Sequence, residues 1–485
     1  MRLRLALVAA ATLLLPAGSL AQGGEAWFAY RLGGIHVGHA RETVSVRPDG
    51  AIATTAHTEF LIRRGDDLAA MSVSEEWIET ADGAPVAYHA SRVLSGESRE
   101  LRVTIDGDTL LVATDAGGEA AERAVPVDGQ LLFPRAVDAL HAARGLVAGD
   151  AYAFSYFDTD FERVGRAEVL VVGEDAVAVM GEERGLVKLV VRSDLLAGIE
   201  TIEWRDRRGR LWRSEVPAAG LTQERADPEQ AVVGGAPGDL AARLAVPSNV
   251  RLDAPWAVDW AVYELWTEDG EGALFVPEDG RQTLEGVTEQ GVLLRVVRAA
   301  PDAAAPGGRD TGGGATAAYL ESNALLQTGY PPLAAAAARA AQAAGDDPWR
   351  KATAIEAFVH EHIENKGFGT AFGSAAEVLS NRSGDCSEHA VLMAAMTRAV
   401  GVPSKLVAGL AYADGVFAYH MWVEVWAGGG WYALDPTLAA GNVDATHIKL
   451  AESAAEGGVT ADISVGILRA LSRLRLRVVD WGTGG

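Results

Sequence analysis

Residues 382–390 read RSGDCSEHA and contain the only cysteine of the 485-residue chain. Within this segment Asp385 suits a helix N-cap, and Glu388, three residues later, can complete a capping box with it. The next ten residues are mostly apolar, and Gly401 then provides a helix stop. This pattern predicts a buried helix with Cys386 in its first turn. Because the N-terminus of a helix carries partial positive charge, it favours a thiolate, and Cys386 is a candidate nucleophile.

The overall composition is that of a globular chain and excludes two classes of partner. Apolar residues make up 49% of the chain and charged residues 22%, both ordinary values for folded domains. The formal net charge is −24, whereas binding to nucleic acids or to anionic membrane surfaces requires clustered Lys and Arg. We therefore expect no nucleic-acid partner and no docking on an anionic membrane.

Residues 1–21 have the pattern of a secretory signal peptide. Arg2 and Arg4 precede a short apolar run, and a small-x-small cleavage site ends at Ala21. This run is too short for a stable membrane span after cleavage, and no later run is long and apolar enough. We expect a mature chain that begins at Gln22 and is periplasmic or secreted, with an uncleaved signal-anchor as the alternative.

The single cysteine is unusual for an exported chain. Exported proteins normally carry paired cysteines, but one cysteine cannot form an intramolecular disulfide. An odd cysteine in a secreted chain indicates a reactive thiol. The alternative is an inert, buried cysteine that behaves as a small apolar side chain.

Residues 24–225 have the composition and turn spacing of an antiparallel β domain. Turn signals such as Asp82-Gly83 and Asp106-Gly107 separate short segments of β-forming residues. The segments predict a meander, either a curved sheet or a sandwich, with one helix over residues 134–144. Strands are expected at 27–32, 35–46, 54–62, 72–79, 152–157, 167–172, 186–191 and 199–204. Four scattered histidines are expected to be ordinary surface or core residues, namely His36, His39, His57 and His89.

The rest of the chain divides into three segments. Residues 226–316 are predicted to be a connector with additional strands and a Gly/Pro-rich loop at 301–314. Residues 317–450 have an α+β pattern, and residues 451–485 form a C-terminal extension with a final strand. Expected helices lie at 331–344, from 348 onward and at 375–379, and expected strands lie at 258–266, 272–276, 292–297, 404–412, 417–426, 431–435 and 474–478.

A cysteine nucleophile needs a base and a third group that orients the base. The predicted strand 417–426 contains His420, and the next predicted strand ends at Asp435. A Gly-Gly-Gly turn joins the two strands, and antiparallel neighbours bring side chains on adjacent strands within reach of each other. A helix packed on this hairpin suits a nucleophile at Cys386. The pattern therefore indicates a Cys-His-Asp triad.

Each member of this triad has a definite role in acyl chemistry. Cys386 attacks a carbonyl carbon, His420 takes the thiol proton and later protonates the leaving amine, and Asp435 fixes the tautomer of the imidazole. The backbone N–H of Cys386, at a helix N-terminus, can donate to the oxyanion. The sequence does not identify a second oxyanion donor, and Asn381 and the tryptophans near His420 are candidates.

Other polar residues near these positions have plainer interpretations. His389 shares a helix face with Cys386 but would have to reach back past the helix N-terminus, so a packing or solvated histidine is expected. Glu388 is expected to be a cap, and Glu424, on the strand face of His420, either lines the site or is a surface carboxylate. No Cys/His cluster has metal-ligand spacing, so we expect no metal and no cofactor.

Four segments together resemble the bacterial transglutaminase-like superfamily. They read GDCSEHA at 384–390, AVGVP at 399–403, YHMWVEV at 419–425 and WYALDPT at 431–437. The superfamily pattern is G-x-C-x-[DE], A-x-G-[IV]-P, H-x-W-x-E and W-x-x-x-D-[PA]-T, in this order. The resemblance covers residues 317–450 and implies an α+β, papain-like core in which the helix bearing the cysteine packs on an antiparallel sheet. The catalytic residues that it implies are Cys386, His420 and Asp435.

The expected function follows from the triad and the export signal. We expect an exported cysteine acyltransferase, peptidase or amidase that acts on peptide or carboxamide bonds through an acyl-thioester. Hydrolysis and transfer to an amine both remain open, and the expected partners are protein or peptide substrates, including cell-wall peptides. The alternative is an envelope binding or assembly module that uses the transglutaminase-like core as a scaffold. The N-terminal β region loosely resembles periplasmic sheet domains, which implies no function.

Overall fold

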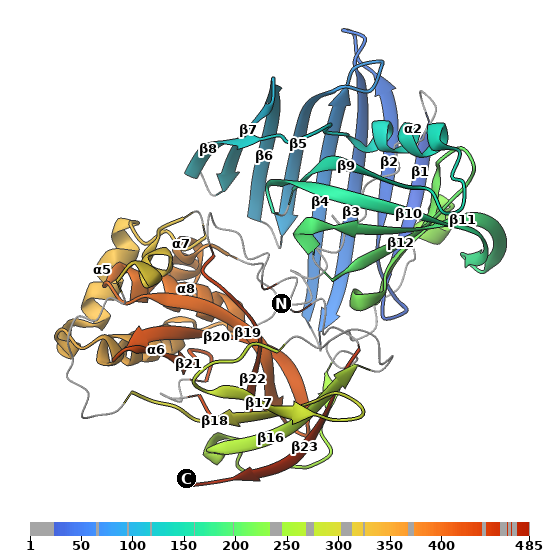
Figure 1. Ribbon diagram of the computed structural model, residues 1–485. Helices are drawn as coiled ribbons and strands as arrows, with labels where there is room; N and C mark the ends of the chain where they lie inside the picture. The colour runs from blue at the N-terminus through green and yellow to red at the C-terminus, as the bar shows by residue number, and fades with distance from the viewer. Residues whose placement is uncertain are drawn as a thin grey trace. The chain divides into compact units, whose positions relative to one another are not determined.

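A computed structural model of the chain shows two compact units, one ending at residue 240 and the other spanning residues 241–485. Each unit is described by itself (Figure 1). The signal peptide expected at 1–21, the strand expected at 272–276 except its last residue, and most of the loop expected at 301–314 lie outside the described residues. The described residues are 24–64, 67–94, 97–116, 119–159, 161–196, 198–232, 245–267, 276–301, 313–323, 325–366, 373–438, 443–455, 463, 467 and 473–484.

Fourteen antiparallel strands form one sheet in the described part of the N-terminal unit. The order is β8-β7-β6-β5-β4-β3-β2-β1-β14-β13-β12-β11-β10-β9. Strands adjacent in the chain are therefore adjacent in the sheet, except β8 and β9, which lie at its two ends, and β1 pairs β14. The antiparallel meander expected for this region is confirmed. The strands are β1 Glu25–Leu32, β2 Ile35–Val46, β3 Ile52–Arg64, β4 Asp67–Glu79, β5 Pro85–Leu94, β6 Glu97–Asp106, β7 Thr109–Ala116, β8 Glu119–Pro126, β9 Ala151–Asp158, β10 Arg163–Val179, β11 Glu182–Ser193, β12 Glu200–Arg205, β13 Leu211–Val216 and β14 Leu221–Ala226.

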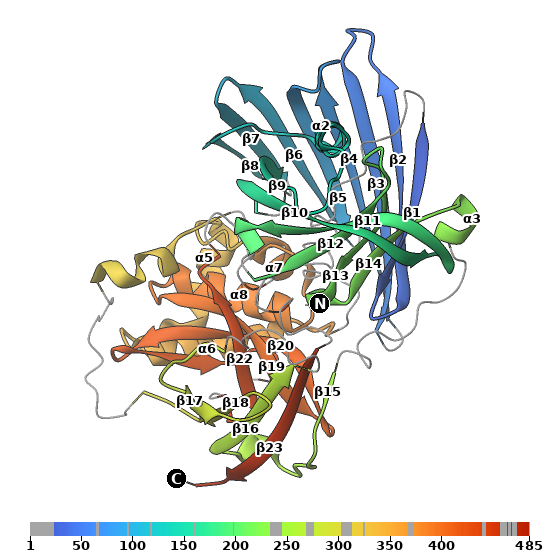
Figure 2. The same cartoon turned by 45° about the vertical axis from the view of Figure 1, so that its right-hand side comes forward.

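The helix α2 (Pro134–Arg144) has the bounds that the sequence predicts, and Gly145 ends it with a φ of 68°. In Figures 1 and 2, α2 lies between the long strands β2–β5 and the strands β9–β12. Arg205 on β12 is buried and donates to Asp138 of α2 at 2.5 Å and to Glu203 at 2.6 Å. These bonds compensate the buried guanidinium and join α2 to β12. A short helix, α3 (Pro228–Ala231), follows β14.

The described part of the C-terminal unit contains a five-stranded sheet with helices beside it (Figure 1). Its strands run in the order β15-β20-β19-β22, and β21 pairs β20. Helix α8 packs against β19 and β20. No described helix is long and apolar enough to cross a membrane. The elements are β15 Val246–Pro247, α5 Pro331–Ala340, α6 Pro348–His362, α7 Ala375–Asn381, α8 Cys386–Ala399, β19 Ser404–Ala413, β20 Val416–Ala427, β21 Gly430–Leu434 and β22 His447–Ser453.

A second sheet of this unit combines segments far apart in the sequence. Its order is β17-β18-β16-β23, from β16 (Trp260–Thr267), β17 (Gln282–Val287), β18 (Val292–Val297) and β23 (Leu474–Gly482). Tyr263 of β16 packs edge-on against Phe417 of β20, with ring centroids 5.6 Å apart. Strands from the predicted connector and from the predicted C-terminal extension thus form one sheet, and this sheet packs on the five-stranded sheet.

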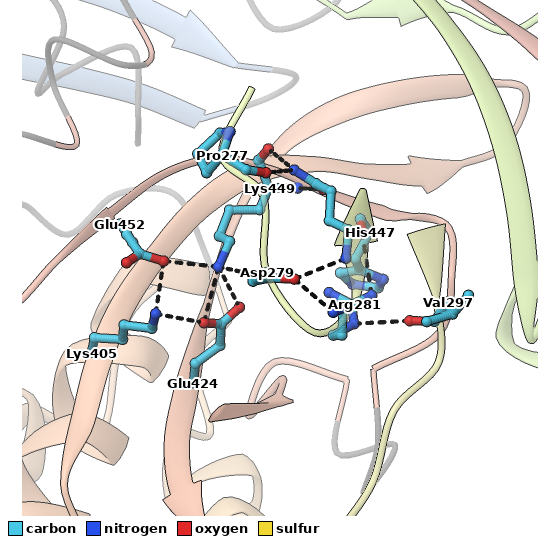
Figure 3. Close-up of polar contacts among 10 residues, drawn as sticks. Pro277, Asp279, Arg281, Val297, Lys405, Glu424, His447, Lys449 and Glu452 are labelled. Carbon is cyan, nitrogen blue, oxygen red and sulfur yellow. Dashed lines mark hydrogen bonds and ion pairs between the residues drawn. The ribbon is translucent and has the colours of Figure 1, made fainter. Parts of the chain in front are cut away.

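A buried cluster of charges joins the two sheets (Figure 3). The ammonium group of Lys449 lies 3.1 Å from both carboxylate oxygens of Glu424 and 2.8 Å from Glu452, and it also pairs with Asp279. Lys405 lies 3.1 Å from Glu424 and 2.8 Å from Glu452. Both expectations for Glu424 are therefore wrong, because its carboxylate is buried within this charge cluster and neither lines the site nor faces solvent.

Gly409 provides a test of how closely β22 approaches β19. A Cβ atom at Gly409 would lie 1.8 Å from the carbonyl oxygen of Ile448 and 2.8 Å from the ring of Trp422. We predict that Gly409→Ala lowers the free energy of unfolding by about 2 kcal/mol, because the strands must separate to accept the methyl group. Equilibrium urea unfolding measures this change.

Gly286→Ala is the matched control. Gly286 lies in a strand of the same unit, and nothing would lie within 4 Å of a Cβ atom there. The free energy of unfolding of the Gly286→Ala variant should differ from that of the wild type by no more than about 0.5 kcal/mol. Equal stability of the two variants would contradict the close packing of β22 on β19.

Candidate active site

Cys386 is the first residue of α8, and its side chain is partly exposed. The carboxylate of Asp385 accepts from the backbone N–H of Ser387 at 3.0 Å, and Glu388 accepts from the backbone N–H of Asp385 at 2.9 Å. The predicted capping box is thereby confirmed. Since the N-cap fixes where the helix begins, it also fixes the sulfur at the positive end of the helix dipole.

Glu388 is buried directly beneath this turn. A Cβ atom at position 384 would lie 2.2 Å from the Cβ of Glu388, so only glycine fits before the N-cap. Burial, and then the nearby carboxylate of Asp385, raise the pKa of Glu388 well above its ordinary value. The side chain is therefore held in its neutral form, in which it caps the helix without adding a second buried negative charge.

We predict that Glu388→Gln is tolerated, because an amide has nearly the shape of a protonated carboxyl group. The folded-state pKa of Glu388 is raised above its unfolded value of 4.5. The wild-type chain therefore loses stability as pH rises above 4.5, whereas the variant lacks this loss. Urea unfolding gives the free energy of unfolding of both chains at pH 4 and pH 7. The free energy of the variant, relative to that of the wild type, should be higher at pH 7 than at pH 4. A difference that does not change with pH would contradict the neutral carboxyl group.

His420 and Asp435 meet across the β20–β21 hairpin. The Nε2 atom of His420 lies 2.6 Å from Oδ2 of Asp435. The second oxygen of Asp435 accepts from the backbone N–H of Thr437 at 2.9 Å, and the backbone N–H of Asp435 donates to Glu356 of α6 at 3.1 Å. Asp435 has 1% of its side chain exposed, so its charge lies in a site from which water is almost excluded. The hairpin thus places the two side chains as the sequence predicts.

The side chain of Cys386 lies beside His420, since it contributes together with Asp435 to the raised pKa of the imidazole. Burial alone lowers the pKa of His420, but Asp435 and the Cys386 side chain outweigh it and raise the pKa to about 10. Burial raises the pKa of Asp435, but His420 and then His447 hold it well below the ordinary value. At neutral pH the arrangement favours an imidazolium between an ionised carboxylate and the sulfur.

We predict that the imidazole of His420 titrates near pH 10 in proton NMR of the folded protein. Asp435→Asn removes the carboxylate charge, so the titration midpoint should fall towards 6.5. The His420→Asn variant identifies the signal among the ten histidines. Because the folded pKa exceeds the unfolded one, the contribution of His420 to stability is complete below pH 6.5 and disappears as pH rises through 10. An unchanged midpoint in Asp435→Asn would contradict the ion pair.

A second histidine, which the sequence did not single out, also contacts Asp435. The Nε2 atom of His447 lies 3.4 Å from Oδ2 of Asp435, and its Nδ1 atom lies 3.2 Å from Asp444. His447 is the first residue of β22, a strand that the sequence analysis did not predict. The sequence signal that could have identified His447 is a group of closely spaced polar residues, namely Asp444, Thr446 and His447. Nothing in the sequence places this group beside Asp435.

These contacts also define the described group best suited to a metal ion. One nitrogen each of His420 and His447 and one oxygen of Asp435 all lie within 4.8 Å of one another. The 2.6 Å between His420 and Asp435 is a hydrogen-bond distance, whereas two ligands of a tetrahedral zinc ion lie about 3.3 Å apart. The geometry therefore fits a hydrogen-bonded group better than a metal centre.

His389 is buried, and it is not placed as the base. Its Nδ1 atom lies 2.7 Å from the carbonyl oxygen of Asp385, four residues earlier, and burial lowers its pKa. This is the packing histidine that the sequence predicts. His360 of α6 lies close to the site. Its Nδ1 atom is 3.2 Å from the carbonyl oxygen of Pro436, the residue after Asp435.

One comparison with known proteins finds a family match in this part of the chain. Residues 335–436 match the transglutaminase-like superfamily. The chain contains a transglutaminase-like domain. The matched region includes Cys386, His420 and Asp435, and it ends before the loop that carries His447. The expected superfamily resemblance and the α+β fold class, with a large antiparallel sheet before the transglutaminase-like domain, are thereby confirmed. The comparison with curated proteins gives no match.

Solved structures show weaker similarity. A candidate cysteine protease from Cytophaga hutchinsonii is 14% identical, with 47% of this chain and 86% of that chain covered and a TM-score of 0.32. A beta-barrel-like domain of unknown function from Brucella abortus is 13% identical, with 41% and 93% covered and a TM-score of 0.32. A candidate protease from Parabacteroides distasonis is 12% identical, with 70% and 64% covered and a TM-score of 0.19. TM-scores of this size do not establish a shared fold.

Proposed function

We propose that the chain is a cysteine enzyme that cleaves peptide or carboxamide bonds through Cys386, His420 and Asp435. The observation that supports this most strongly is the 2.6 Å hydrogen bond between His420 and the buried carboxylate of Asp435, with the partly exposed Cys386 beside the same imidazole. A structural core thiol has no need of a charged imidazole beside it. The superfamily to which the domain is similar typically consists of cysteine peptidases and acyltransferases.

The reaction begins with the thiolate of Cys386 and the imidazolium of His420. The sulfur attacks the carbonyl carbon, and the carbonyl oxygen becomes an oxyanion that the N–H groups at the start of α8 can stabilise. His420 gives its proton to the departing amine, and the carbon–nitrogen bond breaks to leave an acyl-thioester. Water or a second amine then attacks the thioester, with His420 as the base, and the thiolate is restored.

The proposed setting is the cell envelope. The motivation is the signal-peptide pattern of residues 1–21, which makes exported proteins and cell-wall peptides accessible substrates. Whether water or an amine resolves the thioester depends on the shape of the acceptor site. The mass of the released product distinguishes the two, because hydrolysis gives a free acid and transfer gives a new amide.

We predict that Cys386 of the folded chain reacts with iodoacetamide at pH 6 much faster than the same thiol in urea, because the imidazolium of His420 stabilises the thiolate. After incubation with an envelope peptide extract, mass spectrometry should detect an acyl adduct on Cys386 that hydroxylamine removes. His420→Asn should reduce turnover by about a thousandfold or more.

The control is His57→Asn, which changes an exposed histidine of the N-terminal unit and should leave both readouts unchanged. Alkylation of the folded wild type no faster than that of the unfolded chain, together with the absence of any adduct, would contradict the enzyme. The envelope binding or assembly module would then be the better interpretation of the intact core.

A further inference from the structure

The feature that the proposed triad does not explain is His447, whose ring lies between two buried carboxylates. Its Nε2 atom faces Asp435 at 3.4 Å and its Nδ1 atom faces Asp444 at 3.2 Å. Only 3% of the His447 side chain is exposed. Carboxylate oxygens only accept hydrogen bonds, so each of these contacts requires an N–H group on the imidazole. Oδ2 of Asp435 thereby lies between two histidines, because His420 contacts the same oxygen.

The loop that carries His447 is held by residues of the four-stranded sheet. Arg281 donates to the carbonyl oxygens of Asp444 at 2.9 Å and of His447 at 3.4 Å. The hydroxyl of Tyr263 donates to the carbonyl oxygen of Ala445 at 2.9 Å. Figure 3 shows Arg281 beside His447, next to the buried charge cluster around Lys449. These contacts fix the backbone on both sides of the His447 ring.

Gln282, the residue after Arg281, fixes the start of β22. The side-chain amide of Gln282 accepts from the backbone N–H of Lys449 and donates to its carbonyl oxygen, both at 2.9 Å. The ring of Trp422 packs edge-on against His447 at 5.5 Å between ring centroids. Arg281, Tyr263, Gln282 and Asp444 thus help to fix the position of His447 from outside the matched region 335–436, whereas Trp422, Asp435 and His420 lie inside it.

We propose that His447 is a positioning residue for the reaction, which donates a second hydrogen bond to Asp435 and so sets the orientation and basicity of the carboxylate that holds His420. The effect of this hydrogen bond on catalysis rests on the proposed function, whereas the hydrogen bond itself does not. A carboxylate that receives two donors on one oxygen is less basic than one that receives a single donor. His420 can then release its proton to the leaving amine more readily. Asp444, which also accepts from Thr446, fixes the far side of the His447 ring.

The charged and titratable groups around this ring come from four separate segments. Asp435, after β21, and Asp444, before β22, contact it directly. His420 of β20 lies 5.7 Å away between ring centroids, and Arg281, just before β17, contacts the backbone of the loop. Because two carboxylates contact the imidazole of His447, the ring is suited to donate hydrogen bonds to them. An apolar side chain of similar size would serve equally well if the ring only filled space.

Two amide substitutions separate the donor role from the packing role. In His447→Gln the amide nitrogen can occupy the place of Nε2 and keep a donor towards Asp435. In His447→Asn the shorter amide reaches only the place of Nδ1, towards Asp444. We expect His447→Asn to lower kcat about ten- to a hundredfold with little change in KM and to move the titration midpoint of His420 upwards, because Asp435 becomes more basic. His447→Gln should stay near the wild type in both readouts.

Urea unfolding of both variants shows whether they are folded, and the NMR titration of His420 needs no substrate. Equal effects of the two substitutions, or a midpoint that is unchanged or lower in His447→Asn, would overturn the donor role. If the midpoint shifts as expected but no thioester forms on Cys386 of the wild type, the proposed reaction fails and the hydrogen bond from His447 to Asp435 stands. The two hypotheses therefore have separate outcomes.

Discussion

The burial of the Asp435 carboxylate is the constraint on which the rest of the C-terminal unit depends. A charge with 1% of its side chain exposed is stable only if hydrogen bonds and opposite charges replace the water it has lost. Three donors surround the carboxylate, namely His420, His447 and the backbone of Thr437. Each comes from a different part of the chain segment 416–453, so that the position of one side chain requires β20, β21 and β22 to be in register.

The same constraint explains the buried charges on the neighbouring strands. Lys405, Glu424 and Lys449 are buried on the five-stranded sheet, where apolar residues would be cheaper to desolvate. Their mutual ion pairs, with Asp279 from the segment before β17, make the contact between the two sheets specific as well as stable. A buried polar network of this kind reinforces the register, because each ion pair forms in only one alignment of the strands.

The sequence predicts the parts of this structure that depend on local signals. The capping box at Asp385, the hairpin between β20 and β21 and the helix bounds of α2 are all set by residues within a few positions of one another. It does not predict β5–β8, β13–β15, β17 or β22. Residues 97–126 carry many charges on the exposed face of the sheet, which weakens the apolar signal, and β22 is buried on nearly every residue, so that no alternation is visible. His447 was missed for a different reason, since the residues that connect it to the site, Asp435 and His420, are 12 and 27 positions away and only the tertiary fold brings them together.

The pairing of β16 with β23 has a consequence for the boundaries of the catalytic region. Residues 260–267 and 474–482 are hydrogen-bonded neighbours, although the whole matched segment 335–436 lies between them in the sequence. Excision of the matched segment alone, or trimming of the last dozen residues by a protease, would separate the two edges of this sheet. We therefore expect the smallest segment that folds on its own to be much longer than the matched region 335–436. It includes the C-terminal strand β23, which supports the fold of the enzyme that we propose.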